Sequence, residues 1–186
     1  MAVEQRLYTV EEYEAFLERS ENDERLFELI NGEIVEKMPT QEHGVITLRF
    51  GAKILTFVEE HNLGHVGVEI RHRPANDQHN DRLPDISFTR DASKELVTKA
   101  AVLSMPDLVV EVQSPSDTWR KMREKARYYI AKGTRLVWLV FQQQRIVEVY
   151  APDDEFTATE YDILDGRDVL PGFKIAIRDI FPQQKG

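Results

Sequence analysis

Two acidic residues stand inside apolar, strand-like runs of this chain. Asp85 lies between Pro84 and the run Ile86-Ser87-Phe88, and Glu111 interrupts the apolar run 108–112. An ionised carboxylate is costly to remove from water unless it is paired, hydrogen-bonded or bound to a cation. Two neighbouring strands would bring both carboxylates to one hard divalent cation such as Mg²⁺, which takes one or two protein carboxylates together with water and phosphate. The two residues therefore predict a metal site.

A metal held there would suit phosphate chemistry. A bound divalent cation lowers the pKa of an attacking water and offsets the charge of a phosphate. Glu111 supports the prediction more than Asp85 does, because a turn aspartate after proline is common whereas a glutamate inside an apolar run needs a partner. His43 could also approach such a site, although a histidine near a helix start is more often a capping or structural residue.

The elements that would position these residues follow from hydrophobic periodicity. Apolar residues recur at helical spacing over 41–61, and the predicted stripe consists of Val45, Leu48, Ile54, Leu55 and Val58. Strands are expected at 65–73, 83–88 and 106–113, the last of them central and covered on both faces. A helix over 117–132, with Asp117 in its N-cap turn, and a strand over 136–141 follow. The strand-helix-strand passage predicts a right-handed crossover and a partly parallel sheet.

Further β-structure is expected on both sides of this core. Asn31-Gly32 best supplies the positive φ angles of a type I′ turn, so 25–30 and 33–38 are predicted to form a hairpin. Thr9 and Glu12 resemble a capping box that opens a short helix. A further strand is expected at 146–150, and the tail over 156–180 alternates short β-like pieces with turns. We therefore expect an α/β fold with a mixed (α+β) sheet, in a single domain spanning 1–186 with its core at about 41–141.

Composition limits the classes of function. The 186 residues carry a formal charge of −9 and include no cysteine, which excludes disulfides, zinc-thiolate sites and thiol nucleophiles. No apolar run approaches a bilayer span, and Met1 to Arg6 lacks a signal-peptide stretch, so a soluble, cytoplasmic protein without membrane contact is expected. The global basic excess of a dedicated DNA binder is missing, and the basic clusters at 71–73 and 120–132 are read as solvating side chains.

The residues carry a family resemblance. Pro84-Asp85, Glu111-Val112-Gln113 and the helix with Lys125 resemble the PD-(D/E)xK nuclease signature on its α-β-β-β-α-β core. Over Tyr8 to Tyr150 the chain resembles the Uma-two family of restriction-endonuclease-like proteins; the matching segments are 28–33, 84–86, 110–117, 125–129 and 137–140. Each motif is weak alone, whereas their order on the expected elements is specific. The resemblance implies a Mg²⁺- or Mn²⁺-dependent endonuclease that hydrolyses phosphodiester bonds of nucleic acid, DNA in particular.

The resemblance also implies roles for single residues. Asp85 and Glu111 would bind the metal, with the Val112 carbonyl as an added ligand. The superfamily pattern expects a lysine two residues after the glutamate, where this chain has Gln113, which cannot supply a cation. In the resembling family this lysine is displaced onto the following helix, and Lys125 matches its position, to orient water or stabilise charge on the phosphate. Glu28 would be an accessory acid at the edge of the site.

Other interpretations stay open. Read alone, Lys125 is a surface lysine and Glu28 a hairpin glutamate that faces solvent, while Tyr129 and Trp138 are core aromatics. The acidic charge and Gln113 also fit a catalytically inactive nuclease-fold protein that acts in assembly or weak nucleic-acid binding. An enzyme for a small phosphorylated molecule would share the same chemistry. A homodimer is expected, because symmetric pairs are the commonest oligomers and two sites suit the cutting of two strands.

Overall fold

The computed structural model describes residues 6–183, so the expectation for Met1 to Arg6 falls almost entirely outside the described residues. The chain divides into two compact units. One combines the residues up to Met38 with Arg71–Leu83 and Val97–Ser104, and the other consists of Pro39–Ile70, Pro84–Leu96 and the residues from Met105 on. The single domain over 1–186 stays a prediction. Within residues 6–183, no helix is both long enough and apolar enough to cross a bilayer.

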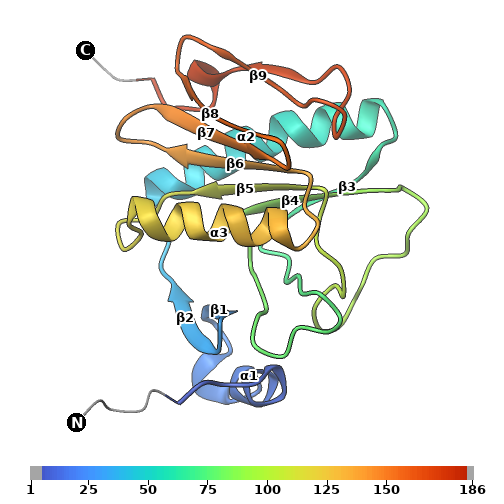
Figure 1. Cartoon of the computed structure of the whole chain (residues 1–186), viewed down its shortest axis with the longest axis vertical. Coiled ribbons are helices and arrows are strands. Elements are labelled where there is room, and N and C mark those ends of the chain that lie inside the picture. The colour runs from blue at the N-terminus through green and yellow to red at the C-terminus, as the bar shows by residue number, and fades with distance from the viewer. Residues whose placement is uncertain (1–5, 184–186) are drawn as a thin grey trace. The chain divides into compact units, whose positions relative to one another are not determined.

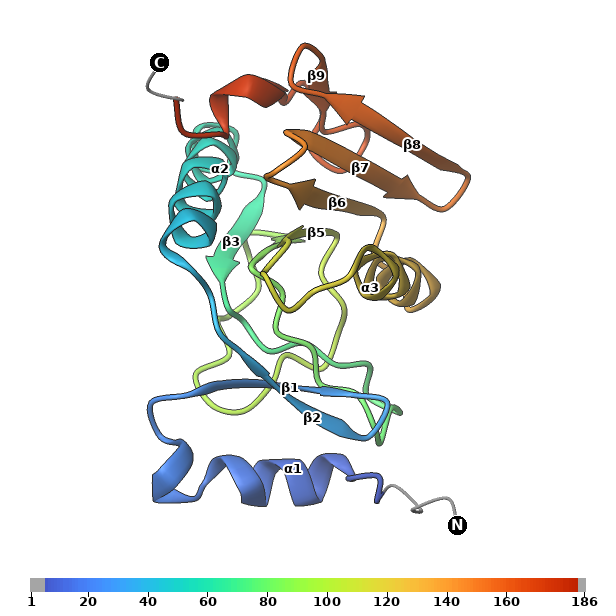
Figure 2. The same ribbon diagram turned by 90° about the vertical axis from the view of Figure 1, so that its left-hand side faces the viewer.

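The first unit contains a short helix and the predicted hairpin (Figure 2). Its elements are α1 (Val10–Leu17), η1 (Ser20–Asn22), β1 (Leu26–Ile30) and β2 (Glu33–Lys37). The predicted capping box is present, since Thr9 and Glu12 exchange side-chain to backbone hydrogen bonds. Asn31 and Gly32 have φ angles of 50° and 83°, as the hairpin prediction requires. Tyr13 of α1 donates a hydrogen bond to the Phe27 carbonyl and closes a small core between helix and hairpin.

The second unit is a six-stranded mixed sheet in the order β3-β4-β5-β6-β7-β8, with α2 and α3 on its two faces (Figures 1 and 2). The bounds are α2 (Gln41–Glu60), β3 (Gly64–Val68), β4 (Ile86–Arg90), β5 (Leu108–Val112), α3 (Trp119–Ala131), β6 (Leu136–Phe141), β7 (Ile146–Ala151), β8 (Asp154–Thr159), β9 (Ile163–Asp165), β10 (Lys174–Ala176) and η2 (Ile177–Asp179). Only β5 and β6 pair in parallel in this sheet, through the α3 crossover. The predicted α-β-β-β-α-β core and mixed sheet are confirmed.

Side-chain alternation along β5 and β6 divides the core of this unit. Even-numbered residues such as Val110 and Trp138 pack with α2 and the C-terminal segment, whereas odd-numbered ones such as Val109 and Val137 pack with α3. Both strands are fully buried, which confirms the prediction for β5. Because successive strand residues point to opposite faces, Glu111 is directed to the α3 side.

The predicted face of α2 was partly wrong. Val45, Leu48 and Leu55 are exposed, whereas Ile46 and Phe50 join Ile54 and Val58 in the core. The buried residues follow one another at a spacing of four, so they form one stripe, and the exposed apolar residues lie on another side of the helix. A helix with two apolar stripes does not reveal from its own sequence which one packs on the sheet.

Three boundaries also differ from the expectation. The first core strand ends at Val68, because Glu69 has a left-handed φ of 52°. The second starts at Ile86, so Asp85 precedes β4 instead of lying inside it. The N-cap of α3 is Thr118, whose side chain accepts a hydrogen bond from the Lys121 N–H.

Candidate active site

Asp85 is held between the central strand and the start of α2. It is 1 % exposed, and its Oδ2 accepts a hydrogen bond of 2.7 Å from the Val112 N–H. The same oxygen lies 3.0 Å from Nε2 of His43, which is 4 % exposed. The pairing of β4 with β5 ends at Ile86 with Val110, so continuing this register by one residue sets Asp85 across from Glu111. The sequence predicts both carboxylates inside neighbouring strands; in the structure Glu111 lies on β5, and Asp85 directly precedes the neighbouring strand β4.

His43 is a residue whose contact with the site the sequence did not establish. The sequence leaves open whether His43 approaches the site or is a capping or structural residue, and the structure pairs its ring with Asp85. The N-cap of α2, Thr40, accepts a hydrogen bond from the backbone N–H of His43 and fixes this first turn. A signal did exist, because His43 lies three residues before Ile46 on the buried stripe of α2.

Glu111 is 2 % exposed on β5 and contacts two side chains of α3. Nζ of Lys125 lies 3.6 Å from its Oε2, and the Tyr129 hydroxyl donates a hydrogen bond of 2.8 Å to its Oε1. Lys125 and Tyr129 are one helical turn apart and so share a face. Lys125 is 8 % exposed, so its reading as a surface lysine is wrong, whereas Lys121 one turn earlier is exposed. Tyr129 is buried as expected, and its hydroxyl also serves as a hydrogen-bond donor to Glu111.

The donor set fits a hard divalent cation. Within residues 6–183, no three His, Cys, Asp or Glu side chains gather closely enough to form a metal site by themselves. A two-carboxylate set matches the way Mg²⁺ is held, with substrate phosphate and water as the other ligands. Each carboxylate offers about four lone-pair positions, so a carboxylate can accept hydrogen bonds and ligate a cation at the same time. Val112 gives its N–H to Asp85, and the role of its carbonyl as a ligand stays a prediction.

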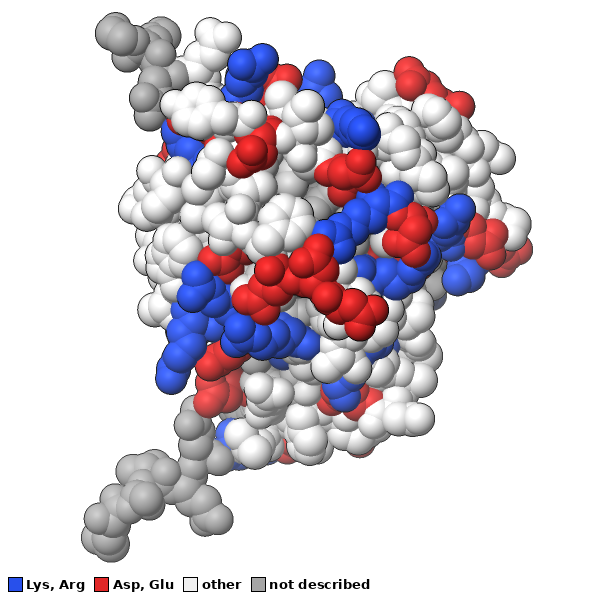
Figure 3. Space-filling view, turned by 45° about the horizontal axis from the view of Figure 1, so that its top comes forward, with Lys and Arg blue, Asp and Glu red and all other residues white. Residues whose placement is uncertain are grey.

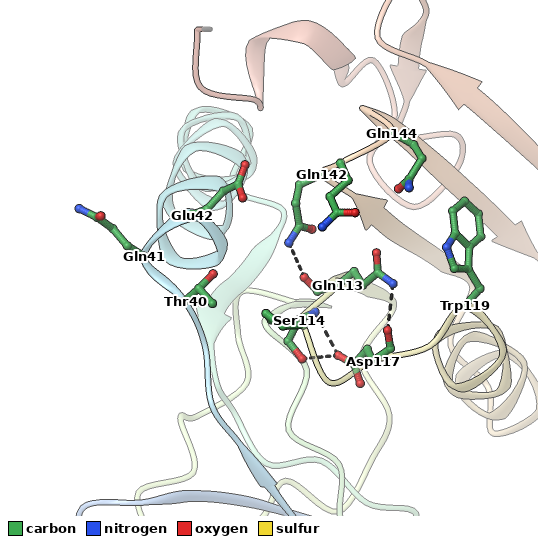
Figure 4. A pocket seen from close by; sticks show the side chains of 11 residues that line it. Thr40, Gln41, Glu42, Gln113, Ser114, Asp117, Trp119, Gln142 and Gln144 are labelled. Atoms are coloured by element: carbon green, nitrogen blue, oxygen red, sulfur yellow. Dashed lines mark hydrogen bonds between the residues drawn. The ribbon is translucent and has the colours of Figure 1, made fainter. Parts of the chain in front are cut away.

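Gln113 lies at the end of β5 and is bound into the following loop. Its Nε2 donates to the Asp117 carbonyl at 3.0 Å, and its own carbonyl accepts from Nε2 of Gln142 at 2.7 Å (Figure 4). Asp117 is not the N-cap of α3; its Oδ2 accepts hydrogen bonds from the backbone N–H and hydroxyl of Ser114 instead. Gln113 therefore organises the loop between β5 and α3, and its catalytic role stays a prediction.

Glu28 belongs to the first unit and is buried on β1, so the reading of a solvent-facing hairpin glutamate is wrong. Its role as an accessory acid stays a prediction. In the same unit Arg71 forms ion pairs with Glu14 and Asp81, and burial raises the pKa of Asp81 despite this pairing. This basic cluster therefore pairs within its own unit and is not simply a solvating face.

Basic side chains of the second unit are also paired with acids. On α3, Arg123 contacts Glu148 and Arg127 contacts Glu155. Positive and negative side chains are interspersed on the face of the described chain that Figure 3 draws. The positive charge of the 120–132 segment is thus largely offset by neighbouring carboxylates.

Comparisons with known proteins identify the family and the fold of this chain. The sequence model of the Uma2 family, described as "Putative restriction endonuclease", matches residues 10–178. The crystal structure of a "putative nuclease belonging to DUF820" from Anabaena variabilis ATCC 29413 shares the fold with a TM-score of 0.72 and 23% sequence identity, over 83% of this chain and 89% of that one. Among curated proteins, none matches. Since the match extends over most of its length, this chain belongs to the Uma2 family.

Proposed function

We propose that this chain is a metal-dependent endonuclease that hydrolyses phosphodiester bonds of nucleic acid, DNA in particular. The observation that carries the proposal is the contact of 3.6 Å between Lys125 of α3 and Glu111 of β5. The PD-(D/E)xK pattern expects a lysine at the position of Gln113, and a helix lysine supplies a cation beside the same carboxylate. Membership of a family described as a restriction endonuclease supports the same reaction.

In this mechanism Asp85 and Glu111 would hold Mg²⁺ or Mn²⁺, with the Val112 carbonyl as a further ligand, and the cation would lower the pKa of water and offset phosphate charge. The chain's own groups fix the two carboxylates in advance. His43 and the Val112 N–H orient Asp85, and the Tyr129 hydroxyl orients Glu111. Such preorganisation avoids reorganising the site during the reaction.

The charge on Lys125 acts on the substrate side. Its ammonium orients the attacking water or stabilises negative charge that develops on the phosphate. Gln113 has an accessory part in this proposal, because its amide holds the loop after β5.

The test is cleavage of plasmid DNA by purified protein with Mg²⁺, with Mn²⁺ and with a chelator. Glu111→Gln and Lys125→Gln should each lower the rate by about 100-fold or more, as removal of a group that stabilises transition-state charge does. Matched controls are Glu148→Gln, a buried paired carboxylate on β7, and the exposed Lys121→Gln, which should both retain activity. Equal cleavage by wild type and Glu111→Gln would refute the proposal.

Two features of the charge distribution favour a second function. The offset basic charge on α3 and the net charge of −9 also fit a catalytically inactive nuclease-fold protein that acts in assembly or weak nucleic-acid binding. Calorimetric titration with Mn²⁺ separates the two, since binding to wild type that is lost in Glu111→Gln supports the nuclease. Competition between DNA and small phosphoesters tests the substrate class, and sedimentation tests the predicted homodimer.

A further inference from the structure

A hollow of about 430 Å³ lies where β5 and β6 end, beside the first turn of α2 (Figure 4). β5 and β6 are parallel, so both lead into loops at the same edge of the sheet. Ligands of α/β proteins commonly bind beyond the carboxyl ends of such strands. The hollow adjoins the proposed active site, since Gln113 follows Glu111 by two residues and Glu42 directly precedes His43.

Amide side chains dominate the lining of this hollow. Eleven residues line it, and five of them are glutamines: Gln41, Gln113, Gln142, Gln143 and Gln144. They come from the start of α2, the end of β5 and the turn between β6 and β7. An amide offers donors and an acceptor in one plane, so it can pair with a ligand that presents both along one edge.

The charge of the lining selects against phosphate. The eleven lining residues include no lysine or arginine, and two of them, Glu42 and Asp117, are acidic. An anion would meet carboxylates here, whereas a neutral ligand with N–H donors would find acceptors. The volume falls within the range of pockets that hold small ring-shaped ligands, about 300–1,000 Å³.

One acceptor in the lining is left without a partner. Gln142 donates from Nε2 to the Gln113 carbonyl, while its buried Oε1 has no hydrogen-bond partner among the described residues. A buried acceptor without a donor is unfavourable, so a ligand N–H that reaches Oε1 would bind favourably. This observation favours a ligand that donates as well as accepts.

Trp119 supplies an apolar side of the hollow. Its ring stacks on Phe141 with centroids 4.0 Å apart and planes at 12°, which holds it in place. Arg123 lies over the same ring, with 5.2 Å between its Cζ and the centroid. Trp119 therefore adds apolar surface beside the amides of the lining, which suits a heterocycle with a polar edge.

We propose that this hollow is a subsite for one unpaired nucleobase that carries an exocyclic amino group, adenine best of all. The proposal rests on the proposed function, because the base belongs to the nucleic acid that the neighbouring carboxylates act on. The side-chain amide of glutamine pairs with adenine by accepting from the N6 amino group and donating to N7 of the base. The Glu42 carboxylate and Oε1 of Gln142 accept from an amino group, which thymine and uracil lack. Single-stranded nucleic acid supplies such a base at the lowest cost of unpairing and unstacking.

The test measures base preference without cleavage. The full-length Glu111→Gln protein is titrated with single-stranded homo-oligomers of dA, dC and dT, and binding is followed by tryptophan fluorescence. Trp138 is fully buried in the core, so the signal reports on Trp119. We expect dA to bind about 10-fold more tightly than dT, as one good amide–base pair provides.

Further substitutions are made in the same Glu111→Gln protein. Adding Gln142→Leu, or adding Gln41→Ala with Gln144→Ala, should remove the preference for dA. Adding Gln183→Ala, which does not line this hollow, should keep it. The subsite is overturned if the Glu111→Gln protein binds dA and dT with equal affinity. It is also overturned if the preference for dA survives both Gln142→Leu and the pair Gln41→Ala with Gln144→Ala, in proteins whose circular dichroism is unchanged. Failure of the nuclease is a separate result, because a dA preference without cleavage by wild type refutes the proposed function and keeps the subsite.

Discussion

The contact between Lys125 and Glu111 can be measured as a coupling free energy. Both side chains are almost fully buried, and 3.6 Å separates Nζ from Oε2. Two unit charges at this distance attract by about 4.6 kcal/mol at an effective dielectric constant of about 20. Desolvation of both groups offsets part of this attraction, so we expect a net coupling of about 2–4 kcal/mol.

The perturbation is a double-mutant cycle of Lys125→Met and Glu111→Gln. Lys125→Met alone should lower the free energy of unfolding by about 3 kcal/mol, because Glu111 then remains charged and buried with the Tyr129 hydroxyl as its hydrogen-bond donor. The double variant should recover most of this loss. Methionine resembles lysine in shape and glutamine resembles glutamate, and neither replacement carries a charge. Urea denaturation followed by circular dichroism gives all four values.

The same cycle also tests the metal. Mn²⁺ can replace the missing ammonium beside Glu111, so it should raise the stability of Lys125→Met more than that of wild type and leave Glu111→Gln nearly unchanged. Lys121→Met is the matched control, because Lys121 is exposed one turn earlier on α3 and its loss should cost no more than about 0.5 kcal/mol. A coupling energy near zero, or equal losses for Lys125→Met and Lys121→Met, would refute the reasoning.

Two further predictions concern single side chains. Tyr129→Phe removes the hydroxyl that donates to the buried Glu111 carboxylate and should cost about 1.5–3 kcal/mol in urea denaturation, whereas Tyr128→Phe should cost clearly less; equal losses would contradict the role of the hydrogen bond. Burial lowers the pKa of His72 from its ordinary value of 6.5, so the unfolded chain binds the proton more readily than the folded one. Its contribution to stability is therefore complete above pH 6.5 and is lost as the pH falls from there toward the folded pKa. His72→Gln should therefore flatten the dependence of the free energy of unfolding on pH, whereas His79→Gln at an exposed position should leave it unchanged. If the free energy of unfolding depends on pH with the same slope in both variants, another group is responsible.

Local sequence patterns were enough for most of the secondary structure. The Asn31-Gly32 turn and the Thr9–Glu12 capping box depend on contacts between residues at most three positions apart, and both are present. The order of helices and strands in the second unit also followed from periodicity alone. Predictions of this kind succeed because the interactions that decide them lie within a few residues of one another.

The packed face of α2 could not be read in the same way. The helix carries Ile46 and Phe50 on one side and Leu48 and Leu55 on another, with similar apolar character. The sheet buries the side that meets Trp138 and the other even-numbered strand residues. Shape and volume at that contact decide between the two stripes, and neither is a property of the helix sequence by itself.

By itself, the sequence determined that Asp85 and Glu111 need partners, since each stands next to residues that must leave water. The family resemblance already pointed to Lys125, but only the tertiary structure showed which side chains contact the two carboxylates: His43, 42 residues before Asp85, and Lys125 and Tyr129 on the helix after Glu111. Lys125 shows the physical reason. Its side chain looks like a solvated surface group until packing of α3 on β5 removes the water and leaves a buried carboxylate as its neighbour.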